Sequence, residues 1–131
     1  MTDPVAAMLA ADRASRDLGI ELVESAPGRA TARMAVTGAM VNGHGLAHGA
    51  FVFAVADTAF ACACNSRGPV TVAAGADITF VAPVRRGDEL VAEAVERTRY
   101  GRNGIYDVTV RRGTDVVAEF RGRSRTVGGP V

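Results

Sequence analysis

The amino-acid sequence predicts an α+β fold in which a curved, largely antiparallel sheet wraps around one long helix. Two features of the chain predict this fold. Residues 50–64 form an apolar stretch of helical length, and segments of alternating or β-branched character lie before and after it. The connections among the last four of these segments are too short for crossover helices, so the strands are expected to pair antiparallel.

The first expected elements are an amphipathic helix and a hairpin. The opening Thr-Asp-Pro offers a cap followed by proline at the first helical position, and the apolar spacing behind it predicts one short helix at about residues 4–18. Residues 20–25 and 29–36 have strand character, and an Ala-Pro-Gly turn separates them. A hairpin is therefore expected there.

The central helix follows a glycine-bearing loop at residues 37–48. Four strands come after it, at residues 70–81, 89–99, 105–112 and 116–126, each bounded by Gly, Pro or Asp. A helix that is apolar on nearly every side needs cover all round. A curved sheet would cover part of the helix surface. The strip of the helix that the sheet leaves uncovered suggests a partner subunit.

Size and composition predict one globular domain. A chain of 131 residues has the usual length of a single domain, and 48% hydrophobic with 22% charged residues excludes a disordered protein. Residues 1–131 are expected to form that domain, with a loose tail at about residues 127–131. The net charge of +1 gives no reason to expect nucleic acid or a membrane as a partner. No signal-like or membrane-spanning segment is found, so the cytoplasm is the expected location.

Asp57 is the most informative residue of the chain. It is the one carboxylate in the apolar segment at residues 50–64, and burying an unpaired carboxylate costs on the order of several kcal/mol. Two explanations are open. Asp57 caps a neighbouring loop, or it does chemistry as a general base on water or as a nucleophile.

Metal and nucleotide sites fit the sequence poorly. His44 and His48 are four residues apart and Asp57 is a conceivable third ligand, but the interspersed glycines argue against a continuous helical face. Cys62 and Cys64 are two apart on the expected helix, so they suit neither a disulfide nor a metal clamp and are interpreted as small core residues. The glycine spacing misses the dinucleotide fingerprint. No metal is expected.

The sequence around Asp57 resembles a known family. Residues 42–49 read Asn-Gly-His-Gly-x-x-His-Gly, residues 57–61 read Asp-Thr-Ala-Phe-Ala, and residues 100–108 continue the similarity. With the order of elements, this resembles the hotdog-fold acyl-CoA thioesterases of phenylacetic acid degradation over nearly the whole chain. The resemblance implies a hotdog fold and hydrolysis of phenylacetyl-CoA, ring-hydroxylated phenylacetyl-CoA or a similar short or aromatic acyl-CoA, without a cofactor.

Thioester hydrolysis needs a polarised carbonyl as well as an activated nucleophile. Gly49, at the start of the long helix, offers an unsatisfied N–H reinforced by the helix dipole, and it lacks a side chain that would block a carbonyl. Its alternative role is to ease a tight turn. Gly49 and Asp57 are about 12 Å apart along a helix, whereas reacting groups converge within about 3 to 3.5 Å. One chain is thus not expected to supply both groups to one thioester.

The resemblance implies further roles in the site. Asn42 matches a position that orients the water or the thioester carbonyl, although it also suits a plain Asn-Gly turn, and His48 fixes the loop before Gly49. Each candidate for substrate binding also has an ordinary structural interpretation in packing or on a solvated surface. These candidates are Thr58 beside the carboxylate, Phe51 at the acyl group, and Arg86, Arg102 and Asn103 at the phosphates of coenzyme A.

The expected assembly is a homodimer with two shared active sites, and further association to a homotetramer. Two antiparallel central helices at a dimer axis would place Asp57 of one chain opposite Gly49 of the other. The alternative from another class is a non-catalytic acyl-CoA-binding hotdog domain, against which Asp57 argues. A hotdog hydratase or dehydratase typically pairs an acid with a His about five residues on, and no such His follows Asp57.

Overall fold

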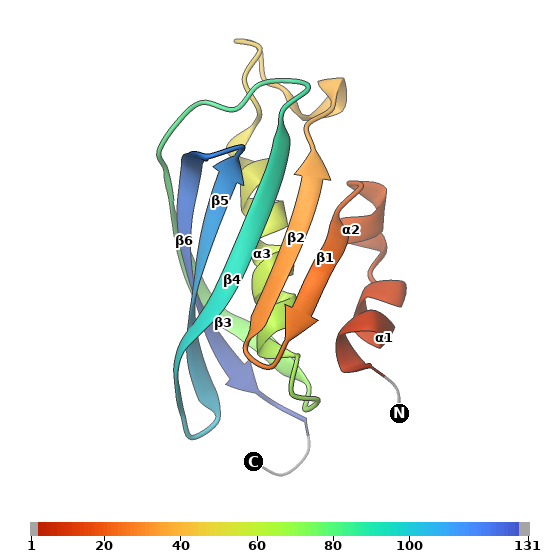
Figure 1. The fold of residues 1–131 in the computed structure, drawn as a ribbon, viewed down its shortest axis with the longest axis vertical. Helices are drawn as coiled ribbons and strands as arrows, with labels where there is room; N and C mark the ends of the chain where they lie inside the picture. Colours follow the sequence, from red (N-terminus) through yellow and green to blue (C-terminus); the bar gives the residue numbers. More distant parts are fainter. Residues whose placement is uncertain (1–2, 129–131) are drawn as a thin grey trace.

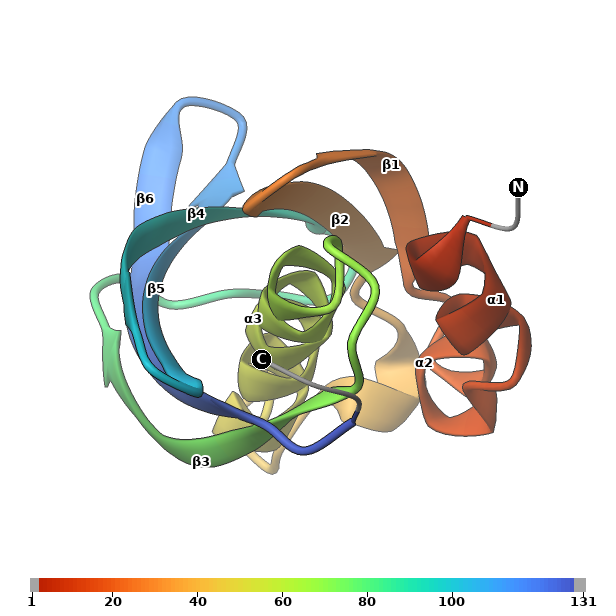
Figure 2. The same cartoon turned by 90° about the horizontal axis from the view of Figure 1, so that it is seen from below.

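The structure, a computed structural model, describes residues 3–128. Within these residues six strands form one antiparallel sheet with the order β1-β2-β4-β5-β6-β3. The strands are β1 Glu21–Ala26, β2 Arg29–Ala35, β3 Thr71–Phe80, β4 Glu89–Tyr100, β5 Asn103–Arg112 and β6 Asp115–Thr126. The sheet curls around a central helix (Figures 1 and 2). The predicted fold class and the predicted hairpin of β1 and β2 are confirmed.

Irregular pairing and glycine let the sheet curve closely around the helix. The register shifts once in the β1–β2, β3–β6, β4–β5 and β5–β6 pairs, and such bulges bend a strand and increase its twist. Gly122 of β6 lies against the ring of Phe60, where a Cβ would come within 2.7 Å of the ring carbons. Only glycine lets the strand approach the helix this closely.

The central helix α3 spans Gly49–Cys64. Its buried side chains pack on the concave face of the sheet, and Val55 and Phe60 are among the largest fully buried residues. Cys62 and Cys64 are both buried and free, as expected of small core residues. One strip of the helix stays partly or fully exposed, at positions spaced by three or four residues: Ala50, Phe53, Ala54, Asp57 and Ala61. The predicted uncovered strip is therefore confirmed, and it carries Asp57.

The N-terminal segment differs from the prediction. Instead of one helix at about residues 4–18, two short helices form, α1 Pro4–Ala10 and α2 Arg13–Asp17. The carboxylate of Asp12 accepts from the N–H of Ser15 at 2.9 Å and from its hydroxyl at 2.6 Å. The prediction of one helix was wrong because Asp12 is an N-cap that starts a second helix, and not a residue on the polar face of the first.

The loop before α3 and the end of the chain also gain structure from the fold. The expected loop at residues 37–48 contains a short 3₁₀ helix, η1 Gly38–Met40. Val127 and Gly128 both donate backbone hydrogen bonds to the Val70 carbonyl, so the first two residues of the expected loose tail run along the start of β3. Residues 129–131, the rest of that tail, lie outside the described residues.

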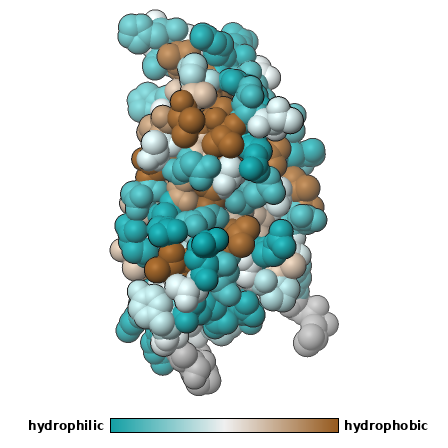
Figure 3. Space-filling model, turned by 60° about the vertical axis from the view of Figure 1, so that its left-hand side comes forward, coloured by the Kyte–Doolittle hydropathy of each residue, from teal (hydrophilic) through white to brown (hydrophobic). Residues whose placement is uncertain are grey.

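The outer face of the sheet is largely polar. Arg121 pairs bidentately with Asp107 at 2.7 and 2.9 Å, across β5 and β6. Figure 3 shows one face of the molecule, on which hydrophobic patches lie among hydrophilic residues. In the part of the chain that is described, no helix combines the length and the apolar character needed to cross a bilayer. The buried apolar side chains of the strands are directed inwards, onto α3, whereas Val72, Phe80 and Val95 stay exposed.

Candidate active site

The loop before α3 is organised by Asn42. Its side-chain Oδ1 accepts from the N–H groups of His44 at 2.9 Å and Leu46 at 3.2 Å. Its own N–H donates to the Leu46 carbonyl at 2.7 Å. This is a turn built by an Asn side chain. Asn42 thus has the turn role that was considered for it, and the turn uses only the oxygen of its side-chain amide.

His48 caps the central helix. Its Nδ1 accepts from the N–H of Ala50 at 3.4 Å, and its own N–H donates to the Met40 carbonyl at 2.7 Å. Since Nδ1 is an acceptor, the neutral ring carries its proton on Nε2. The half-buried ring of Phe51 stands edge-on to the imidazole, with ring centroids 6.4 Å apart. Both side chains therefore hold the entry into α3.

Gly49 is the first residue of α3, and no described residue accepts from its N–H. It lines a depression of about 260 Å³ together with Asn42 and Phe80. Phe80 ends β3 and is 54% exposed. A Cβ at position 49 would come within 2.8 Å of the ring tip of Phe80. The N–H that the sequence proposed as an oxyanion donor thus has no acceptor among the described residues, and Gly49 borders a depression.

Asp57 lies in the middle of the uncovered strip of α3 and lines a second depression, of about 210 Å³. Burial raises the pKa of the Asp57 carboxyl above its ordinary value, and the charge of Asp12 raises it further. The carboxylate accepts no hydrogen bond from residues 3–128 and has no cationic partner among them. It therefore does not cap a neighbouring loop, which was the structural alternative for this residue.

Thr58 turns away from the open strip. It is buried, and its hydroxyl lies 2.9 Å from the hydroxyl of Ser15 in α2. This is the helix-packing role considered for Thr58. The side chain still borders the depression of Asp57, so it shapes the site through packing.

Gly49 and Asp57 belong to different depressions of the same chain. The two depressions share none of their lining residues, and both groups lie on the continuous helix α3. Eight residues of helix separate them by about 12 Å. The described residues of one chain thus do not bring these two groups together.

The candidates for phosphate binding lie at opposite ends of the molecule. Arg86 packs on Gly38, at the end that holds the loop before α3. Arg102 lies in the β4–β5 turn and Asn103 at the start of β5, at the other end (Figure 1), and Asn103 shares a depression with Cys64 at the end of α3. A helix of 16 residues spans about 24 Å. Arg86 and Arg102 of one chain therefore cannot bind the same phosphate.

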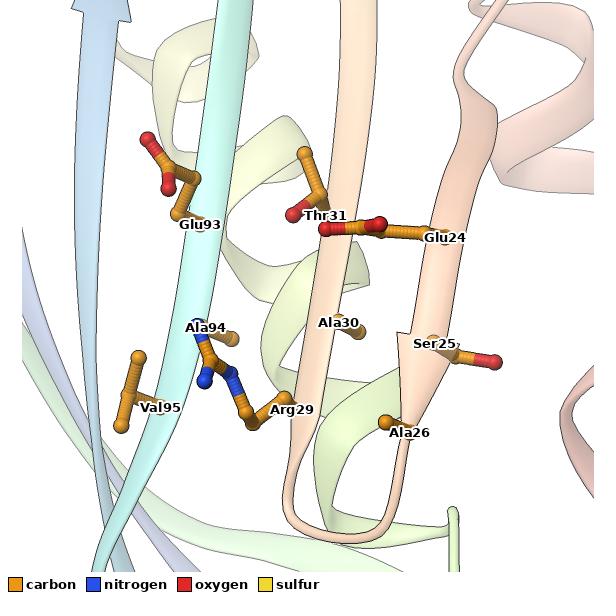
Figure 4. A pocket seen from close by; sticks show the side chains of 9 residues that line it. All are labelled: Glu24, Ser25, Ala26, Arg29, Ala30, Thr31, Glu93, Ala94 and Val95. Carbon is orange, nitrogen blue, oxygen red and sulfur yellow. The ribbon is translucent and has the colours of Figure 1, made fainter.

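A further depression lies on the outer face of the sheet, across β1, β2 and β4 (Figure 4). Its volume is about 290 Å³, and Arg29 and the exposed carboxylates of Glu24 and Glu93 border it. It contains none of the predicted site residues. The candidate site therefore lies on the helix side of the sheet.

Asp12, Ser15 and Phe80 line the two helix-side depressions and were missed by sequence reasoning. The capping pattern of Asp12 and Ser15 was a usable local signal for the start of α2, but nothing local links either residue to Asp57. Phe80 reaches Gly49 only through the fold. In the described part of the chain, no group of three or more His, Cys, Asp or Glu is placed to hold a metal ion.

A six-stranded, curved antiparallel sheet wrapped around one long central helix is the hotdog fold. Residues 44–119 match the family model of the Thioesterase superfamily. The chain therefore belongs to the thioesterase superfamily and is a thioester hydrolase.

Individual relatives confirm the family and the fold. The chain is 41% identical over 126 residues to the acyl-coenzyme A thioesterase PaaI of Escherichia coli strain K12, covering 95% of this chain and 90% of the relative. The solved structure of the E. coli PaaI protein from the phenylacetic acid degradation operon has a TM-score of 0.94 at 40% identity, covering 96% of this chain and 92% of that one. A mutant structure of the phenylacetic acid degradation protein PaaI from Thermus thermophilus has a TM-score of 0.86 at 35% identity, covering 88% and 100%.

Proposed function

We propose that this protein hydrolyses acyl-CoA thioesters to the free acid and coenzyme A, and that phenylacetyl-CoA, ring-hydroxylated phenylacetyl-CoA and similar short or aromatic acyl groups are its substrates. The observation that carries the proposal is the half-buried Asp57 carboxylate, which has neither a hydrogen-bond donor nor a cation among the described residues. The similarity to an acyl-coenzyme A thioesterase and to a protein of phenylacetic acid degradation supports the substrate class.

In the proposed reaction the thioester carbonyl accepts a hydrogen bond from the N–H of Gly49, which stabilises the negative charge on oxygen in the tetrahedral intermediate. Asp57 takes a proton from the attacking water as a general base, or attacks the carbonyl carbon itself to give a mixed anhydride that water then opens. The C–S bond breaks, and coenzyme A leaves as a thiolate that takes up a proton. A raised pKa suits either role, because a stronger base is also a stronger nucleophile.

The amide of Asn42 fits an orienting role in this reaction. Its oxygen is engaged in the turn, and no described residue accepts from its Nδ2. Asn42 borders the same depression as Gly49, so Nδ2 can donate a second hydrogen bond to the carbonyl or to the water. His48 contributes by capping the helix and holding Gly49 in place.

Each site is proposed to form between two chains of a homodimer. The support is the separation of Gly49 and Asp57 into two depressions and the uncovered strip of α3 that carries Asp57. Three members of this strip are alanine, which allows two helices to approach closely. Antiparallel packing of two such helices brings Asp57 of one chain towards Gly49 of the other. Pairs of dimers are proposed to form a tetramer.

Arg86, Arg102 and Asn103 are proposed to bind the phosphates of coenzyme A. Because Arg86 and Arg102 lie at opposite ends of one chain, a shared site places Arg86 of one chain and Arg102 of the other near the same ligand. Guanidinium groups suit this role because they donate paired hydrogen bonds to phosphate oxygens.

Thiol release from a panel of acyl-CoAs tests the proposal. Phenylacetyl, hydroxyphenylacetyl, benzoyl, acetyl, hexanoyl and palmitoyl thioesters are compared for wild type and for Asp57→Asn. We expect turnover of the aromatic and short members, and a loss of about 100-fold or more in kcat for the variant, because it removes the base. Binding of acyl-CoA without turnover by folded wild-type protein would instead indicate a non-catalytic acyl-CoA-binding domain.

A further inference from the structure

The depression around Asp57 has a second wall, which is formed by the N-terminal segment and not by α3. Nine residues line it, and the two ionisable ones are Asp12 and Asp57. The others are small, apolar or hydroxyl-bearing: Ala14, Ser15, Leu18, Ile20, Ala54, Thr58 and Ala61. Helix α2 thus presents a carboxylate to the carboxylate of α3 across a shared hollow.

A chain of hydrogen bonds ties this wall to α3 immediately next to Asp57. The Ser15 hydroxyl donates to Oδ2 of Asp12 at 2.6 Å and lies 2.9 Å from the Thr58 hydroxyl. A serine hydroxyl has one proton, so Thr58 must be the donor to Ser15. Ser15 and Thr58 are both buried. This series of hydrogen bonds therefore has one donor-to-acceptor direction, from the Thr58 hydroxyl through the Ser15 hydroxyl to the Asp12 carboxylate.

The charges that face Asp57 have one sign. Besides Asp12, the titratable groups on α3 itself are the thiols of Cys62 and Cys64, whose pKa burial raises to about 12, so both are neutral at physiological pH. Among the buried residues of the described strands the titratable one is Tyr106, whose hydroxyl donates to Glu96.

Helix α2 carries two cations, and both are engaged outside the depression. Arg13 pairs with Asp17 at 3.9 Å and does not border the depression. The guanidinium of Arg16 donates to the Ala10 carbonyl at 2.9 Å, and Arg16 does not border the depression. No positive charge of the described residues therefore offsets Asp12 in the hollow. A like charge facing a half-buried carboxylate disfavours its ionised form.

We propose that Asp12 is a positioning residue of the active site: its charge faces Asp57 across the depression, and its hydrogen bond to Ser15 holds Thr58, and with it this turn of α3, in place. The proposal rests on the proposed role of Asp57 in thioester hydrolysis. It assigns the N-terminal segment a part in the reaction, because α2 sets the basicity of a group on another helix.

The test compares two substitutions that remove the same charge from the same helix. Asp12→Asn keeps an N-cap oxygen for the Ser15 N–H, since Asn is as good a cap as Asp. Asp17→Asn is the matched control: Asp17 is 68% exposed, pairs only with Arg13 at 3.9 Å and lies outside the depression. Asp12→Ser, another uncharged cap, serves as a second variant should Asp12→Asn fold poorly.

Two readouts separate a positioning role from a structural one. The side-chain carboxyl of Asp57 is titrated by ¹³C NMR, and kcat/KM for phenylacetyl-CoA is measured against pH. We expect the pKa of Asp57 to fall in Asp12→Asn, and the acid limb of kcat/KM to move to lower pH with it. Asp17→Asn should match wild type in both.

The outcomes distinguish this inference from the proposed function. If wild type is active and Asp57 titrates at the same pH in wild type, Asp12→Asn and Asp12→Ser, the inference is overturned. A loss of thermal stability without any change in the titration also overturns it, because it leaves Asp12 as a cap alone. If wild type hydrolyses no acyl-CoA, the proposed function fails, while the NMR titration still decides whether the charge of Asp12 acts on Asp57.

Discussion

The ring of Phe80 lies against Gly49, so close that a Cβ on Gly49 would come within 2.8 Å of its Cζ. Phe80 stands at the end of β3 and Gly49 at the start of α3, and 31 positions separate them in the chain. Both residues line the same depression. Glycine at this helix start is therefore required to leave room for the Phe80 ring as well as for an approaching carbonyl.

Gly49→Ala is expected to lower kcat/KM about 10- to 100-fold, because the added methyl displaces Phe80 and crowds the space before the N–H, and small misplacements cost this much. Thiol release from acyl-CoA measures the effect. Gly43→Ala is the control, since a Cβ at this glycine of the same loop meets nothing within 4 Å. Equal activity of the two variants would contradict the assignment of Gly49.

Asp57→Asn is expected to stabilise the folded protein at neutral pH while it abolishes turnover. The pKa of Asp57 is raised in the folded state, chiefly by burial, so the folded state binds this proton more tightly than the unfolded chain does. The contribution of Asp57 to stability is fully present when the pH lies below the pKa of Asp57 in the unfolded chain. It is lost as the pH rises through the pKa of Asp57 in the folded protein. Wherever the Asp57 carboxyl is ionised, the wild type carries the cost of a buried charge, which the uncharged amide of the variant lacks.

Urea unfolding of wild type and Asp57→Asn at several pH values measures this difference. The stability advantage of the variant should grow as the pH rises from acid to neutral and should vanish below the ordinary pKa of Asp. Asp17→Asn, at an exposed position, should gain no stability over the same range. A variant that is less stable than wild type at neutral pH would show that a partner satisfies Asp57.

A mixture of two strongly impaired variants is expected to regain activity if the site is shared. Chains with Asp57→Asn and chains with Gly49→Ala are combined, dissociated and allowed to reassociate. Each mixed dimer then has one site with both defects and one site with neither, so about a quarter of the wild-type sites return after random pairing. If one chain supplied both groups, the mixture would stay as inactive as its components.

Arg86→Gln and Arg102→Gln are each expected to raise KM for acyl-CoA by roughly three- to tenfold with little change in kcat, because a charge-assisted contact to a phosphate is lost. An acyl thioester of N-acetylcysteamine, which has no phosphate, should react equally with wild type and both variants. Arg121→Gln is the matched control, because Arg121 is held by Asp107 on the outer face of the sheet. A rise in KM for both kinds of substrate would refute phosphate binding.

Much of the architecture could be predicted from short stretches of sequence. The hairpin of β1 and β2, the long helix with one carboxylate and the four strands after it were all expected, and the observed elements begin and end within a few residues of the predicted bounds. These features depend on turn residues, caps and hydrophobic periodicity, each of which acts over a few neighbouring residues. The break at Asp12 was missed because a cap inside an amphipathic pattern looks like a residue of its polar face.

The candidate site was only partly predictable. Asp57, Gly49, Asn42 and His48 lie in one continuous segment with a long motif, and the N–H of Gly49 and the carboxylate of Asp57 have no hydrogen-bond partner among the described residues. Thr58 was grouped with them by adjacency, yet it points to Ser15, 43 positions earlier in the chain. Adjacent residues of a helix point in directions about 100° apart, so sequence proximity does not predict a shared face.

The sequence by itself determined that a carboxylate must lie within an apolar helix inside a curved antiparallel sheet, and that the helix begins at a glycine with a free N–H. Only the tertiary structure decided what faces these two groups. Phe80 lies against Gly49, and Asp12 lines the same depression as Asp57. These placements depend on the strand order, which sets β3 and β1 at opposite edges of the sheet, and on the packing of α2 against α3. Such contacts join segments tens of residues apart and arise from the packing of the whole chain, which no local pattern encodes.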